Sequence, residues 1–300
     1  MSRLQYGSII LSCLSCLASC TEDATGPGDG LPPGMNITVD HTAATLDQIP
    51  TVWIEQAAVE LVIAYGHTSH GSQLVTGMQG LVAWKGPLYA FNATGASGAL
   101  QLRDNPFSGA ADLGNPDRTA WASATRTYLD AHPEVNVVLW SWCGQVSTAT
   151  ERDIETYLAL MLELEEAYPA VRFVYMTGHL DGTGTDGNLH LRNEQIRRFC
   201  HERGRNLYDF ADIESYDPDG AGYLAKAAND NCDYDEDGDG QRERNWALQW
   251  QDSHPGEWFS CSAAAQRKPE GLCGLAPLGQ NRRVERSLLT PCLQGARALL

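Results

Sequence analysis

The chain has 300 residues, of which 43% are hydrophobic, a proportion typical of a globular protein with a packed core. Its 38 acidic and 21 basic side chains give a net charge of −17, which argues against nucleic acid as a partner because that binding requires a basic surface. No apolar run after the first 20 residues is long enough to span a membrane.

The first 20 residues have the organisation of a bacterial lipoprotein signal peptide. Arg3 precedes a short apolar segment at 8–17, and residues 17–20 (LASC) resemble a lipobox, whose cysteine is lipidated after cleavage. An ordinary signal peptide cleaved nearby is the alternative. Residues 21–35 are acidic and rich in Gly and Pro, as in a flexible linker. We therefore expect an extracytoplasmic protein of the bacterial cell envelope, on the outer membrane or cell surface, that contacts the membrane only through a lipid on Cys20.

The residues that follow alternate between predicted helices and strands. In chain order, we expect a helix at 50–60, a strand at 61–66, a helix at 73–82, a short strand at 88–92, a Gly/Ala/Asp-rich loop at 94–116, a helix at 119–131, a strand at 135–142, a helix at 150–168, a strand at 171–177, a helix at 189–203 and a strand at 206–210. Alternation of this kind implies parallel strands joined by right-handed crossovers. The sequence therefore predicts an α/β fold over 36–262, a three-layer α/β/α sandwich of flavodoxin-like type with a mostly parallel sheet.

Three of the predicted strands end in clusters of polar side chains. The clusters are His67/Ser69/His70/Ser72/Gln73, Cys143/Gly144/Gln145 and Gly178/His179/Asp181. The carboxyl ends of parallel strands meet at one edge of a sheet, so these clusters should converge. A serine on a tight turn, amide donors for an oxyanion and a histidine base form an acyl-transfer site. The alternative is that these residues only cap helices and satisfy loop backbone.

The layout over residues 50–262 resembles the SGNH/GDSL hydrolase superfamily. In that superfamily a nucleophilic serine follows the first strand, and later blocks supply a glycine and an asparagine to the oxyanion hole. The resemblance implies that Ser69 is the nucleophile, with Ser72 as the second choice, and that Gln145 stands in for the asparagine. It also implies oxyanion contacts from the backbone of Gly114 and Gly144.

A late Asp-x-x-His block supplies the catalytic base in this superfamily. The remaining match is Asp252 with His254, so the resemblance makes His254 the first candidate base, followed by His179 and His70. It further implies ester hydrolysis without a required cofactor. We expect a monomer whose substrate is a small-molecule or carbohydrate ester, such as a carbohydrate O-acyl ester.

Two other functions fit parts of the sequence. His67 and His70 have a spacing found in zinc sites, and His179 with Asp181 would complete a ligand set for a metal-dependent hydrolase. A non-catalytic, glycan-binding surface lipoprotein is the second alternative, with Trp140 and Trp142 as its binding edge.

An acidic insertion at 213–246 carries alternating aspartates that favour a structural calcium ion. Asp233, Asp235 and Asp237 fit the first, third and fifth positions of a calcium loop, and Asp239 extends the acidic run. The twelfth position is Arg244 instead of the usual glutamate. A solvated acidic loop without an ion is the alternative.

Six cysteines follow the signal segment, in a compartment where disulfides persist: Cys143, Cys200, Cys232, Cys261, Cys273 and Cys292. Sequence does not fix their pairing, and a bridge between Cys232 and Cys261 would close a loop around the acidic insertion.

The tail at 263–300 lacks both the helical and the strand period, although a last helix is expected there to cover the sheet. Reading its codons one nucleotide later permits an amphipathic, aromatic segment that ends in Ala-Gly-Trp. That segment is similar to the end of uncharacterised secreted bacterial proteins with HTSHGSQ and WSWCGQ motifs. We hypothesise that the tail is frameshifted, and the codons for residues 260–265 test this.

Overall fold

The computed structural model describes residues 37–43, 46 and 49–255. The predicted signal peptide, the lipidation site Cys20, the linker and the C-terminal tail lie outside these residues. Cys261, Cys273 and Cys292 lie outside them as well, so the predictions made for these segments stay predictions.

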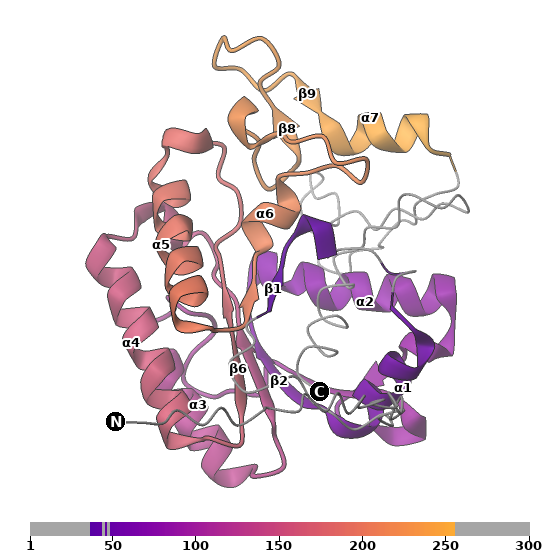
Figure 1. Ribbon diagram of the computed structural model, residues 1–300, viewed down its shortest axis with the longest axis vertical. Coiled ribbons are helices and arrows are strands. Elements are labelled where there is room, and N and C mark those ends of the chain that lie inside the picture. The colour runs from indigo at the N-terminus through magenta and orange to yellow at the C-terminus, as the bar shows by residue number, and fades with distance from the viewer. Residues whose placement is uncertain (1–36, 44–45, 47–48, 256–300) are drawn as a thin grey trace, which may run out of the picture.

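The described chain alternates strands and helices, as the sequence predicts (Figure 1). The strands are β1 (Thr38–Val39), β2 (Val62–Gly66), β3 (Phe91–Asn92), β4 (Leu100–Asp104), β5 (Val137–Trp140), β6 (Arg172–Met176), β7 (Leu207–Tyr208), β8 (Asp233–Tyr234) and β9 (Arg244–Asn245). The α-helices are α1 (Thr51–Glu60), α2 (Ser72–Lys85), α3 (Ala120–Ala131), α4 (Glu151–Ala167), α5 (Asn188–Arg203), α6 (Phe210–Glu214) and α7 (Trp246–Ser253).

Seven strands form one parallel sheet in the order β1-β7-β6-β5-β2-β4-β3. From β2 the chain runs to β3 at one edge of the sheet and then to β4 between them, and it continues to β5 on the other side of β2. The order therefore reverses between β2 and β5, and in doubly wound sheets ligands bind at the carboxyl ends of the strands beside such a reversal. The predicted three-layer α/β/α sandwich is confirmed.

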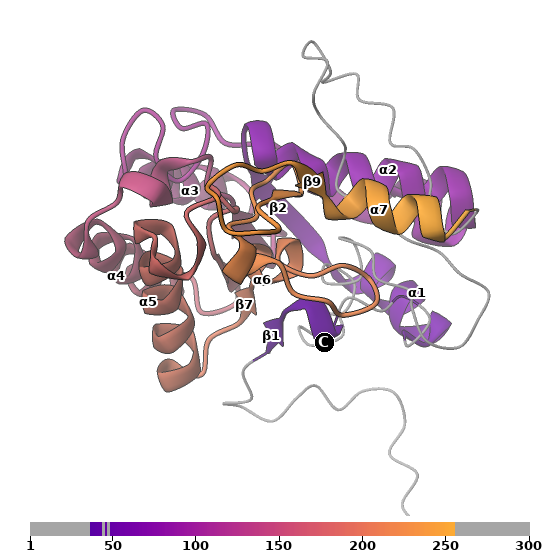
Figure 2. The same ribbon diagram turned by 90° about the horizontal axis from the view of Figure 1, so that it is seen from above.

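Strand β5 shows how the two helical layers cover the sheet. Val137 and Leu139 point into the core formed with α1 and α2, whereas Val138 and Trp140 point into the core formed with α3, α4 and α5. The two groups of helices lie on opposite sides of the sheet (Figures 1 and 2). Because both faces are buried, the strand is a continuous apolar run, and each buried large side chain contributes roughly 1.5–3 kcal/mol to stability.

One central strand was not predicted. The structure places β4 within 94–116, which the sequence analysis assigned to a loop, so that assignment is wrong for Leu100–Asp104. Leu100 and Leu102 are buried and alternate with polar residues, but this pattern is short and is embedded in a Gly-rich stretch. The edge strand β1 was also not predicted. It has only two residues, and its pairing with β7 depends on contacts that are distant in the sequence.

Residues 215–255, called the cap below, form a small separate layer (Figure 1). The antiparallel pair β8-β9 and α7 lie beyond α6, at one end of the molecule. Tyr234 and Trp246 of the cap share a small core with Leu180, which follows β6, and with Ala211 of α6. The cap therefore packs against the carboxyl ends of β6 and β7.

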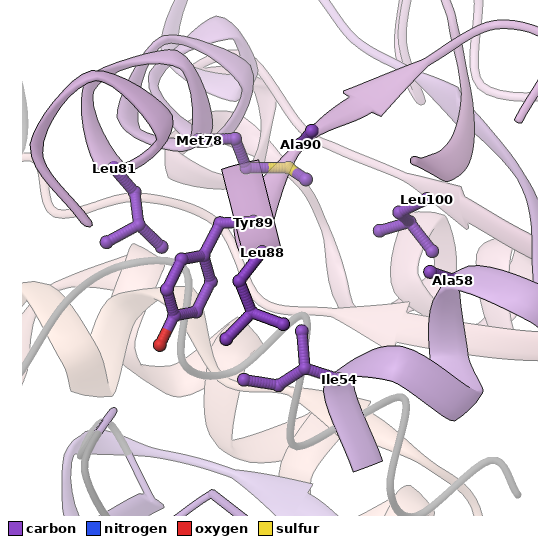
Figure 3. Close-up of a pocket in the computed structure, with 8 residues that line it drawn as sticks. All are labelled: Ile54, Ala58, Met78, Leu81, Leu88, Tyr89, Ala90 and Leu100. Carbon is purple, nitrogen blue, oxygen red and sulfur yellow. The ribbon is translucent and has the colours of Figure 1, made fainter. Parts of the chain in front are cut away.

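An apolar cavity lies between α1, α2 and the turn that precedes β3 (Figure 3). Its volume is about 10 Å³, and its walls include Ile54, Met78 and Leu88. Such a volume holds at most about one water molecule, so this cavity is a packing defect and not a substrate site.

None of the described helices is long and apolar enough to cross a membrane.

Candidate active site

The turn between β2 and α2 presents Ser69 at the carboxyl edge of the sheet. Ser69 opens a short 3-10 turn, its side chain is exposed, and its backbone φ is 40°, in the left-handed region that non-glycine residues seldom adopt. Within the described part of the chain, no group hydrogen-bonds its hydroxyl. Strained backbone of this kind clusters at functional sites, so Ser69 has the position and exposure of a nucleophile.

Two glycines make this turn possible. A Cβ atom on Gly66 would lie 2.3 Å from the Trp140 ring, and a Cβ atom on Gly71 would lie 2.1 Å from Ser141 Oγ. Both neighbours belong to the end of β5, so only glycine lets the turn pack directly against the adjacent strand. The backbone amide of Gly71 donates to the Thr68 carbonyl at 2.9 Å and closes the turn.

Ser72, the second predicted nucleophile, has a different environment. Its hydroxyl donates to the Ser69 carbonyl at 2.6 Å, on the first turn of α2. That bond supports the backbone of Ser69 and occupies the Ser72 hydroxyl, whereas no described group hydrogen-bonds the hydroxyl of Ser69.

The buried carboxylate of Asp112 connects three residues around the turn. Its Oδ2 accepts from the Thr68 hydroxyl at 2.5 Å, and its Oδ1 accepts from the Gly114 amide at 2.8 Å and from Gln145 Nε2 at 3.0 Å. Asp112 is only 1% exposed. The two predicted oxyanion donors, Gly114 and Gln145, are therefore brought together, and one carboxylate fixes both of them.

Gln145 keeps one unused donor. Its Oε1 accepts from the Cys143 amide at 2.8 Å, and one N–H of its side-chain amide donates to Asp112. No described residue accepts from its second N–H, which leaves this donor to a ligand. The single N–H of Gly114 is bound to Asp112, and that of Gly144 donates to His179, so the oxyanion role predicted for these two glycines does not match this arrangement.

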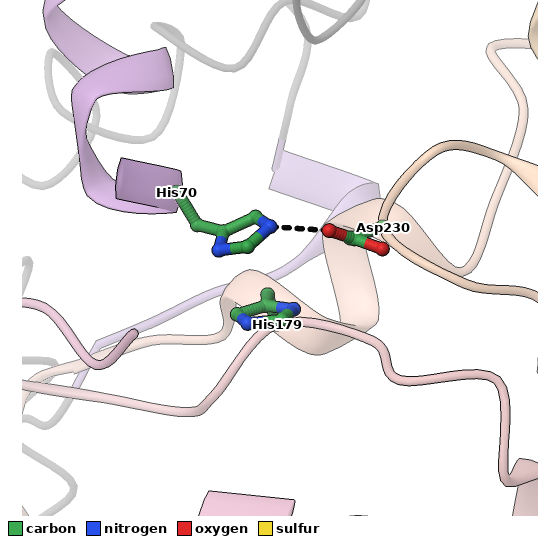
Figure 4. Close-up of side chains that lie close together, drawn as sticks. All are labelled: His70, His179 and Asp230. Carbon is green, nitrogen blue, oxygen red and sulfur yellow. Dashed lines mark hydrogen bonds and ion pairs between the residues drawn. The ribbon is translucent and has the colours of Figure 1, made fainter. Parts of the chain in front are cut away.

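Beside the turn, His70, His179 and Asp230 form a compact cluster (Figure 4). The imidazoles of His70 and His179 stack with ring centroids 3.6 Å apart and planes at 20°. Asp230 Oδ2 is hydrogen-bonded to His70 Nε2. Backbone pairing of Asp181 with Asn229, the residue before Asp230, holds the cap over the loop that follows β6.

Backbone groups fix the proton of His179. Its Nδ1 donates to the Leu180 carbonyl at 2.9 Å, so Nε2 is the acceptor for the Gly144 amide at 3.0 Å. Burial, reinforced by the neighbouring His70, lowers the pKa of His179. Its imidazole is therefore neutral near pH 7.

Two carboxylates lie close to these imidazoles. Burial raises the pKa of Asp230, but the hydrogen bond with His70 outweighs this effect and lowers the pKa overall. Glu214 is buried, and one of its oxygens accepts from the Leu180 amide at 2.8 Å. Its other oxygen, Oε1, has no hydrogen-bond partner among the described residues, and burial raises the pKa of Glu214 well above its usual value.

Two residues of the predicted zinc set lie elsewhere. His67 Nε2 pairs with Asp104 at 2.6 Å, and Asp181 accepts from the hydroxyl and amide of Thr183. The cluster beside the turn therefore contains His70 and His179 of the predicted zinc set together with Asp230, and it does not contain His67 or Asp181.

The predicted base His254 makes its described contacts within the cap. Its ring stacks on Trp250 with centroids 4.2 Å apart, and its Nε2 lies 3.6 Å from Asp219. Asp252 is exposed on α7, and His254 follows the last residue of that helix. In the described chain, no hydrogen bond joins His254 to the Ser69 turn. The other two candidate bases, His179 and His70, form hydrogen bonds, but none of these bonds goes to Ser69.

The aspartates predicted to bind calcium converge in part. Asp235, Asp237 and Asp239 form a group with Glu243 in which the ligand atoms lie within 4.8 Å of one another. Asp233 is outside this group and accepts from Asn245 at 2.8 Å. Calcium binding there stays a prediction of the sequence.

The cysteines and tryptophans named above also have defined environments. Cys143, Cys200 and Cys232 carry free thiols within the described residues, and the suggested partner of Cys232 lies beyond them. Trp140 and Trp142 are 2% and 1% exposed. Both tryptophans belong to the core, so the glycan-binding edge predicted from them is not on the surface.

The fold and the site together define a doubly wound α/β/α protein with polar side chains at the carboxyl ends of its central strands. A scan against protein families finds no match, and a search of curated proteins finds none either.

Sequence reasoning missed three residues of this edge: Asp112, Glu214 and Asp230. Asp112 stands two residues before Gly114, which was identified, but nothing in the sequence marks its carboxylate as a shared acceptor. Asp230 is hidden in an acidic run, and Glu214 ends the short helix α6. Asp230 reaches the site only through the docking of the cap, and Glu214 reaches it at the end of α6, where it binds the Leu180 amide.

Proposed function

We propose that the protein is an extracytoplasmic ester hydrolase of SGNH type in which Ser69 is the nucleophile. The observation that carries the proposal is the turn itself. An exposed serine with a φ of 40° stands between a central strand and a helix, beside the reversal of strand order. Nucleophilic serines require this combination of exposure and fixed geometry.

The proposed reaction has two steps, acylation of Ser69 and hydrolysis of the acyl-enzyme. Ser69 Oγ forms a bond to the acyl carbon, the ester C–O bond breaks, and the serine proton ends on the departing alcohol. Water then attacks the acyl-enzyme, releases the carboxylic acid and restores the serine hydroxyl.

Gln145 supports the charge that develops on the acyl oxygen. Its free amide N–H is held in place because Asp112 and the Cys143 amide fix the rest of the side chain. A donor held in advance stabilises an oxyanion without reorganisation, which is the origin of most oxyanion-hole catalysis.

The proposed substrate class is a carbohydrate O-acyl ester. It rests on the resemblance to SGNH hydrolases and on the lipoprotein signal predicted at Cys20, which would place the enzyme at the cell envelope.

Turnover of a short-chain nitrophenyl ester by the full chain tests the proposal. Ser69→Ala should lower kcat/KM by roughly 10³-fold or more, because it removes the nucleophile. Ser72→Ala should retain most of the activity, and Ser123→Ala on the exposed face of α3 serves as the matched control. Absence of turnover by the wild type, or full activity in Ser69→Ala, would overturn the assignment.

A further inference from the structure

Three segments that are distant in the sequence bring metal-binding side chains to one point. His70 comes from the turn before α2, His179 from the loop after β6, and Asp230 from the cap (Figure 4). One ligand atom from each residue lies within 4.8 Å of those of the other two. Separations of this size fit ligands that surround a single ion.

Unpaired polar atoms at this point indicate a missing partner. Glu214 Oε1 and His70 Nδ1 are both buried, and neither has a hydrogen-bond partner among the described residues. Asp230 already pairs with His70, whereas no described lysine or arginine forms an ion pair with Glu214. Buried polar atoms are normally hydrogen-bonded or bound to a metal, so these two atoms without partners beside the stacked imidazoles favour a bound positive ion.

We infer that His70, His179 and Asp230 bind one divalent transition-metal ion of the zinc class, with Glu214 as an adjoining carboxylate. Two imidazoles and one carboxylate suit zinc and its neighbours, whereas calcium and magnesium prefer oxygen ligands. The inference does not depend on Ser69 being a nucleophile, although the ion would lie beside the Ser69 turn.

The bonds of His179 are compatible with this role. The Leu180 carbonyl accepts from Nδ1–H, the outer contact that commonly orients a metal-bound histidine. Nε2 is then the ligand atom, and the ion would replace the amide of Gly144 there. Gly144 is exposed and has a φ of 57°, which glycine adopts without strain, so its peptide group can turn away.

A second cluster provides a matched control. Asp40, His41 and Asp212 also lie within 4.8 Å of one another, but this group has only one imidazole. The ring and the backbone amide of His41 both bind Oδ2 of Asp212, and none of these three side chains has a buried polar atom without a partner among the described residues. We expect no comparable affinity at this second cluster.

Titration of the chelator-treated full chain with Co²⁺ tests the inference. The wild type should bind one equivalent, with visible ligand-field bands of nitrogen and oxygen ligands and without thiolate charge-transfer bands. His70→Ala and the near-isosteric Asp230→Asn should each weaken binding by roughly 10²-fold. His41→Ala should bind as the wild type does, so Zn²⁺ should raise the Tm of the wild type and of His41→Ala but not that of His70→Ala or Asp230→Asn.

Several results would overturn the inference. These are a wild type that binds no Co²⁺, thiolate bands in its spectrum, His70→Ala or Asp230→Asn with unchanged affinity, or loss of binding in His41→Ala. Asp230→Asn keeps the shape of the side chain, and circular dichroism verifies that each variant is folded. Ester turnover is measured separately, so failure of metal binding and failure of the Ser69 assignment give different patterns.

Discussion

The β2–α2 turn and the cap contribute to the same site by different physical means. The turn is held by close contacts with the main sheet and its loops, since two glycines let it pack directly against the end of β5 and the buried carboxylate of Asp112 binds its threonine. The cap consists of short elements around a small core of its own, and it supplies Asp230 through backbone pairing at Asn229. The turn therefore fixes the position of the proposed nucleophile, whereas the docking of the cap determines which charges surround it.

This difference has a consequence for stability. The turn lies on the main sheet, whose two faces are covered by large apolar cores. The cap buries few apolar side chains, and regions of that kind open with less free energy than the global fold. We expect the cap to exchange its amide hydrogens before β2 and β5 do.

The largest difference between the turn and the cap should appear when one glycine in each is replaced by alanine. Gly71→Ala places a Cβ atom 2.1 Å from Ser141 Oγ, so we expect it to lower the unfolding free energy by about 3 kcal/mol and to abolish ester turnover. In Gly238→Ala, at the tip of the cap, no atom lies within 4 Å, and only its φ of 82° opposes alanine. That variant should lose about 1 kcal/mol and keep its activity.

Urea unfolding of the two alanine variants makes this comparison. Equal losses in both would show that the turn is not held more tightly than the cap.

Loss of the Gln145 amide should affect the reaction more than the fold. Gln145→Ala removes the free N–H assigned to the oxyanion, and we expect kcat for a nitrophenyl ester to fall roughly 10²-fold with little change in KM. Gln195→Ala on α5 removes a glutamine that donates to the carbonyl of Glu151, remote from the turn, and is the control. A larger change in KM than in kcat would mean that Gln145 binds the ground state instead.

The smallest effect concerns the pH dependence of stability. Burial lowers the pKa of His179, so the unfolded chain, whose histidine has a pKa of about 6.5, takes up this proton first as the pH falls. The unfolding free energy should therefore decrease from pH 7.5 to 5.5, by at most about 1.4 kcal/mol per pH unit from this residue.

His179→Gln should flatten that decrease more than His201→Gln, at an exposed position of α5, does. An identical slope in the wild type and in His179→Gln would contradict the role given to burial at this residue.

Much of the fold follows from local sequence patterns. The apolar run of β5 and the helix α4, which begins with a capping box between Thr150 and Asp153, were predictable because their signals are contained within the elements. Strand β4 was not predictable, because its short alternation lies in a Gly-rich stretch and its strand conformation depends on pairing with β2 and β3.

The candidate site likewise contains residues that the sequence predicts and residues that it does not. Ser69, Gln145, His70 and His179 each follow a strand end that the sequence reveals, and parallel pairing then gathers them. Asp112 and Asp230 reach the site through irregular loops, which carry no periodic signal. Their identification required the tertiary structure.

Covalent labelling tests the central assignment most directly. An alkyl fluorophosphonate reacts with activated serines, and mass spectrometry of the digested full chain locates the adduct. The proposed function predicts a single adduct on Ser69 that is absent from Ser69→Ala and that blocks ester turnover in proportion to its formation. An adduct on another serine, or turnover that persists without modification of Ser69, would contradict the account.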